Sequence, residues 1–80
     1  MRYIQLKNKI RSLESSTKTC VYNSRENRAS ALSCRMSLAN DWLDCYMSLC
    51  DLRGSLVLDE DRDPLYFKLR QIRKELTLIR

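Results

Sequence analysis

The side chains most able to do chemistry in this sequence are four cysteines, Cys20, Cys34, Cys45 and Cys50. They include no CxxC pair, and the chain has no histidine. Structural zinc sites usually contain a short turn with two cysteines, and disulfides persist mainly in secreted proteins. We therefore expect the cysteines to be small buried apolar residues, and we expect no metal and no cofactor.

Catalytic groups are scarce. Without histidine, the usual proton shuttle near neutral pH is missing, and a single glycine, Gly54, cannot form a glycine-rich phosphate loop. Asp41 and Asp44 are paired acids, but at one helical turn apart they are typical of a solvated helix face. The sequence therefore predicts a protein that is not an enzyme.

An acidic run near position 60 invites a calcium interpretation. Asp59, Asp61 and Asp63 alternate in a way that resembles an EF-hand loop. That loop needs glycine at its sixth position and an acid at its twelfth, and this chain has Pro64 and Arg70 there. No calcium site is predicted.

The elements that carry these residues are helical. One glycine and one proline among 80 residues are too few for the turns of a sandwich or barrel. The expected fold class is all-α, a single domain (1–80) of three helices at about 2–20, 25–53 and 64–79, with a long central helix. A core this small usually needs reinforcement, which a second copy in a homodimeric helical bundle would supply.

Capping signals set the expected boundaries. Ser24 is predicted to cap the central helix at its N-terminus, and Gly54 to end it in the left-handed conformation. Asp63 followed by Pro64 is typical of a helix start. Between them, the apolar run 56–58 is expected to pack over the end of the core.

The central helix carries two adjacent apolar stripes. The first runs through positions 29, 32, 36, 39, 43, 46 and 50, and the second through 38, 42, 45, 49 and 52. Together they exceed what one neighbouring helix can cover, which predicts homodimerisation. The expected self-association or partner interface consists of Leu38, Trp42, Cys45, Tyr46, Leu49 and Leu52.

Charge is unevenly distributed along the chain. The net charge is +5, with residues 1–35 and 64–80 basic and residues 36–63 acidic. The basic blocks either pair with the chain's own acidic middle or contact nucleic acid. The candidate anion or nucleic-acid contacts are Lys7, Arg11, Arg28, Arg35, Arg70, Arg73 and Lys74.

The segment Asn27–Arg35 resembles the basic-region signature of bZIP transcription factors, with Asn, two small residues and Cys-Arg. The resemblance implies base and phosphate contacts from a helix in the major groove. The corresponding positions are Asn27, Ser30, Ala31, Cys34 and Arg35. The match covers nine of 80 residues, Leu32 and Met36 are apolar where a basic region is charged, and Gly54 interrupts the zipper that should follow. Family membership is not assigned.

These observations predict a small regulatory or adaptor protein that binds an unidentified protein partner through helical surfaces, in the manner of phage and mobile-element accessory proteins. The alternative is a dimeric nucleic-acid-binding protein that uses the basic residues. The N-terminus becomes charged before an apolar signal region can form, and no stretch is apolar enough to span a bilayer. We therefore expect a cytoplasmic protein without membrane contact.

Overall fold

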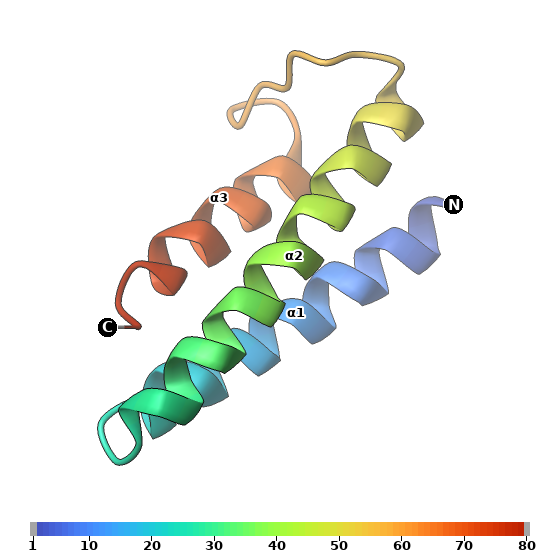
Figure 1. Cartoon of the computed structure of the whole chain (residues 1–80). Coiled ribbons are helices and arrows are strands. Elements are labelled where there is room, and N and C mark those ends of the chain that lie inside the picture. The colour runs from blue at the N-terminus through green and yellow to red at the C-terminus, as the bar shows by residue number, and fades with distance from the viewer. Residues whose placement is uncertain (1, 80) are drawn as a thin grey trace.

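Three α-helices, each antiparallel to the next along the chain, make up the fold in a computed structural model that describes residues 2–79 (Figure 1). They are α1 (Tyr3–Asn23), α2 (Arg28–Arg53) and α3 (Pro64–Leu76). The all-α prediction is confirmed, because residues 2–79 contain no strand. Within this range no helix is long and apolar enough to cross a membrane. The bundle is elongated, with extents of 40 × 22 × 17 Å.

The core runs along the bundle where the three helices meet. The apolar positions of α1 and α3 repeat every three or four residues, so each helix presents one stripe inward. The fully buried large side chains include Leu6 and Ile10 of α1, Leu49 of α2, and Leu69 and Ile72 of α3. With 26 residues, α2 is about 39 Å long and spans the whole bundle, whereas the 13 residues of α3 cover only about 20 Å.

Two of the predicted caps are confirmed. Gly54 has φ +66°, the left-handed conformation that ends α2. The Asp63 side chain accepts a hydrogen bond from the Leu65 backbone N–H at 3.1 Å and so caps α3. Arg53 also donates to both carboxylate oxygens of Asp63, at 3.0 and 3.2 Å, and thereby ties the end of α2 to the start of α3.

The predicted cap at Ser24 is wrong. Helix α1 continues to Asn23, past the expected end near residue 20, and the Ser24 hydroxyl donates back to the Val21 carbonyl oxygen at 2.7 Å. The cap of α2 is Asn27, whose side chain accepts from the Ser30 backbone N–H at 3.1 Å. Asn27, which the bZIP resemblance would place on DNA bases, therefore has a local structural role.

The connection between α2 and α3 differs from its prediction. Leu56 and Val57 are each 85% exposed, so they do not cover the core, and only Leu58 packs against it. Helix α3 also ends at Leu76 instead of near residue 79, yet the Ile79 side chain remains fully buried. A tight turn of backbone hydrogen bonds after Leu76 carries it back into the core.

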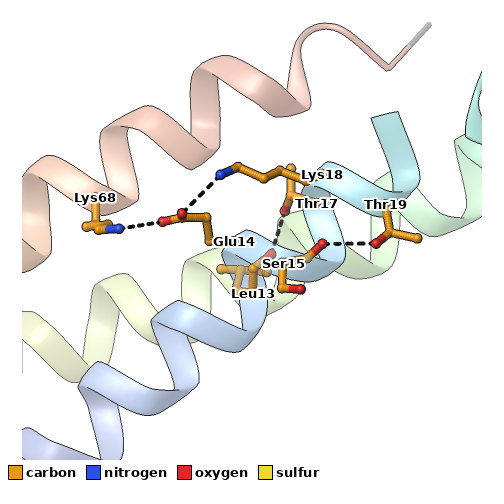
Figure 2. A network of polar contacts seen from close by, with 7 residues as sticks. All are labelled: Leu13, Glu14, Ser15, Thr17, Lys18, Thr19 and Lys68. Atoms are coloured by element: carbon orange, nitrogen blue, oxygen red, sulfur yellow. Dashed lines mark hydrogen bonds and ion pairs between the residues drawn. The ribbon is translucent and has the colours of Figure 1, made fainter. Parts of the chain in front are cut away.

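A polar network joins α1 to α3 along one side of the bundle (Figure 2). Glu14 lies between two lysines and accepts from Lys68 of α3 at 3.0 Å and from Lys18 of α1 at 3.3 Å. The hydrogen bond from Lys68 is the main cause that lowers the pKa of the Glu14 carboxyl, and Lys18 adds to it. In the same region, the Thr17 hydroxyl donates to the Leu13 carbonyl oxygen at 2.8 Å, so a buried threonine is satisfied within α1.

Leu69→Ala should lower the free energy of unfolding by about 2–5 kcal/mol, because it leaves a cavity in the core. Leu56→Ala, the matched control in the exposed connection, should change it by less than about 0.5 kcal/mol. Urea denaturation followed by far-UV circular dichroism measures both values. A large loss in the control would mean that the connection packs on the core after all.

Glu14→Gln should make stability less dependent on pH. Because folding lowers the pKa of the Glu14 carboxyl, its stabilising contribution is present above the unfolded pKa and is lost as the pH falls through the folded pKa. Wild type should therefore lose more stability than Glu14→Gln between about pH 6 and about pH 3. Thermal melts at several pH values measure the difference, and parallel curves for the two proteins would contradict it.

Candidate protein-binding surface

Helix α2 has neighbours on one side only. It packs against both α1 and α3, and in Figure 1 α1 passes behind it while α3 lies beside it. Toward them it presents Leu38, Cys45 and Leu49, all of which are buried. From Leu32 to Met47, the opposite side of α2 is left without a neighbour from residues 2–79, whereas Cys50 farther along the helix is buried.

The side of α2 that faces away from α1 and α3 is apolar. Leu32, Met36, Leu43 and Met47 are 47%, 71%, 50% and 59% exposed, and we call these four residues the outward strip. At 100° per residue they lie within one narrow sector of the helix, and Ala39 lies beside this sector, halfway along its length. Contiguous exposed apolar side chains of this kind mark binding surfaces more often than isolated ones do.

The residues predicted for the interface mostly belong to the chain's own core. Leu38, Cys45 and Leu49 are at most 5% exposed, so a partner could reach them only if the bundle opened. Leu52, at 37% exposed, lies at the margin. Both stripes of α2 are apolar, and the structure turns the second one inward and most of the first one outward.

Trp42 and Tyr46 are partly buried and hold α3 against α2. Their rings stack with centroids 5.4 Å apart and planes 9° from parallel. The Trp42 indole N–H donates to the Leu69 carbonyl oxygen at 2.6 Å, and the Arg73 guanidinium lies 5.4 Å from the centre of the Trp42 ring. These contacts show that both aromatic residues stabilise the packing of α3 on α2.

Opposite charges border the outward strip. The helical period places Arg28 and Arg35 along one edge and Asp44 and Asp51 along the other. Arg35 donates one hydrogen bond to the Ile79 carbonyl oxygen at 3.3 Å. Within residues 2–79, none of these four side chains forms an ion pair.

The remaining candidate basic residues do not form one patch with Arg28 and Arg35. Lys7 and Arg11 lie on α1, beside a hollow that it forms with α3. Arg70 pairs with Glu60 at 3.3 Å, Arg73 covers Trp42, and Lys74 is exposed in the last turn of α3. The chain's own acidic segment thus neutralises part of the basic charge of α3.

The hollow lies between the first turns of α1 and α3, on the side of the bundle away from the outward strip. It has a volume of about 600 Å³. Buried Ile10 and Leu65 form its floor, half-exposed Tyr3 and Phe67 form its walls, and charged side chains surround it. This hollow is not predictable from the sequence, because residues from two helices form it only when the bundle has folded.

The cysteines are free thiols, and Cys20, Cys45 and Cys50 are buried. Burial raises the pKa of the Cys20 thiol to about 11 and also raises that of Cys45. Both thiols are therefore protonated near neutral pH, whereas the thiolate is the form that attacks substrates or binds metals. Within residues 2–79, no three cysteine or acidic side chains are grouped closely enough to hold a metal ion.

Comparison of the chain with protein-family models, with curated proteins and with solved structures finds no match.

The two sides of α2 should respond differently to a polar substitution. Leu38→Ser places a hydroxyl in the core and should lower the free energy of unfolding by about 2–5 kcal/mol. Leu43→Ser, on the outward strip of the same helix, should leave the unfolding of dilute protein within about 1 kcal/mol of wild type. Urea denaturation in dilute solution tests the pair. Equal losses would mean that the two sides of α2 are buried alike.

Proposed function

We propose that the chain is a small non-enzymatic regulatory or adaptor protein, which works as a homodimer and binds a protein partner through helical surfaces. The observation that carries this proposal is that apolar side chains are exposed on two opposite sides of the bundle. The outward strip lies on one side, and the hollow between α1 and α3 lies on the other. Two separate surfaces allow one chain to contact two other protein molecules at once.

The outward strip suits a rigid, preformed interface. Its four side chains are about half exposed, so covering what remains would contribute roughly 1 kcal/mol each. They are carried by a helix that is anchored at both ends, by the Asn27 cap and by the Arg53–Asp63 ion pair. Little conformational entropy is then lost when a partner packs on the strip.

The hollow suits a partner segment with apolar side chains and acidic neighbours. Tyr3 and Phe67 offer two aromatic walls, a residue type enriched at interfaces. Lys7 and Arg11 flank the hollow along α1, and within residues 2–79 neither forms an ion pair. Their charges would attract acidic residues of the partner and disfavour basic ones.

The alternative is nucleic acid. In its favour are the net charge of +5 and four basic residues of α1 and α2 that form no ion pair within residues 2–79, namely Lys7, Arg11, Arg28 and Arg35. Against it, Arg70 and Arg73 are engaged inside the chain, and Trp42 packs in the bundle. The candidate residues therefore do not line up as a groove that follows a phosphate backbone.

A co-purification experiment with matched variants tests the partner surface. The tagged wild-type chain, expressed in its own host and treated with nuclease, should retain one protein in stoichiometric amount. The double variant Tyr3→Ser/Phe67→Ser should lose it, since the walls of the hollow are gone, and Tyr22→Ser, a substitution of an exposed tyrosine outside the hollow, should keep it. Retention that is the same in all three proteins, or no stoichiometric protein at all, would contradict the proposal.

Titration with duplex DNA at two salt concentrations tests the alternative. The proposal expects no binding even at about 50 mM salt. Micromolar binding that weakens steeply with added salt, and that the variants Lys7→Gln and Arg11→Gln reduce, would favour nucleic acid instead.

A further inference from the structure

We infer that the first occupant of the outward strip is a second copy of this chain, packed with its α2 antiparallel to the first α2 and crossing it near Ala39. This inference rests on the proposed function, because it assigns one of the two binding surfaces. It adds the partner, the direction and the register. Three features of α2 lead to it.

The apolar residues of the strip are arranged symmetrically. Leu32 and Met47 lie at equal distances on either side of a centre between Ala39 and Asn40, and so do Met36 and Leu43. A two-fold axis through this centre brings Leu32 against Met47 of the second copy, and Met36 against Leu43. Ala39, one of the two residues beside this centre, is small, which lets the two helices approach closely where they cross.

The charges follow the same symmetry with opposite sign. Arg35 and Asp44 are equidistant from the centre, and so are Arg28 and Asp51. An antiparallel pair therefore places Arg35 of each copy level with Asp44 of the other, and Arg28 level with Asp51. Within residues 2–79 these four side chains lack ion-pair partners, so a second copy would satisfy charges that the single chain leaves open.

The spacing of the strip also sets the crossing angle. Leu32 and Met36, like Leu43 and Met47, are four residues apart, and ridges of that kind pack into each other at about −50°. In an antiparallel pair with a negative crossing angle, the edge of one α2 that carries Arg28 and Arg35 lies over the edge of the other α2 that carries Asp44 and Asp51. A positive crossing angle would move the basic edge of one copy away from the acidic edge of the other.

A parallel pair has no such match. There each residue lies level with its own copy, and Arg35 is separated from Asp44 of the other chain by nine residues, or about 13 Å along the axis. The contact is isologous, as two-fold dimers require, and it leaves the hollow between α1 and α3 open on both copies.

The inference is tested by exchanging the charges at Arg35 and Asp44 and measuring the dissociation constant of the dimer by sedimentation equilibrium. The full wild-type chain should sediment as a dimer whose dissociation constant rises about tenfold in Arg35→Glu and in Asp44→Arg, since each change places like charges together at two symmetric positions. The double variant Arg35→Glu/Asp44→Arg should return to within about threefold of wild type. Arg25→Glu and Asp41→Arg, which are exposed and lie outside the strip, are the matched controls and should stay near wild type.

The results separate this inference from the proposed function. A wild-type chain that remains a monomer, single variants that match their controls, or a double variant that is no better than the single ones would each overturn the antiparallel dimer. If the chain forms a dimer that responds to the charge substitutions as expected but retains no host protein, the antiparallel dimer is supported and the adaptor function is contradicted. Circular dichroism spectra of all variants establish that differences in association do not come from unfolding.

Discussion

A helix in a three-helix bundle can turn only one side toward its two neighbours, and α2 has apolar residues on two sides. Its inward side packs Leu38, Cys45 and Leu49 between α1 and α3. Within residues 2–79 no helix is left to cover Leu32, Met36, Leu43 and Met47, because all three helices already form the core. The exposure of the outward strip is thus a direct consequence of the fold, and the binding function proposed here depends on it.

The rest of the molecule holds that strip rigid and sets its surroundings. The Arg53–Asp63 ion pair and the Trp42 hydrogen bond fix α3 against α2, which places Arg35 beside the end of α3 and keeps the basic edge of the strip distinct from its acidic edge. On the far side, residues of α1 and α3 line the hollow. Chemistry by thiolates is disfavoured in the same structure, because burial raises the pKa of the Cys20 and Cys45 thiols.

Local signals in the sequence predicted local structure well. The Gly54 stop and the Asp63–Pro64 start depend on backbone conformation within a few residues, and both are confirmed. The end of α1 was missed because Thr17 and Cys20 are buried in the core, and this packing outweighs the weak helix propensity of the segment around them. The sequence does not show which of the two stripes of α2 faces the core, because both are apolar and only packing against α1 and α3 distinguishes them. The hollow likewise depends on residues far apart in the chain.

The central claim is that other protein molecules cover the outward strip, and oxidation of its two methionines tests this most directly. The chain is treated briefly with peroxide at a series of protein concentrations, with free methionine added as a rate standard, and Met36 and Met47 are quantified by mass spectrometry. Both methionines should oxidise nearly as fast as the standard in dilute protein, and both should become protected together as the protein concentration rises. Oxidation rates that do not change with concentration would contradict it.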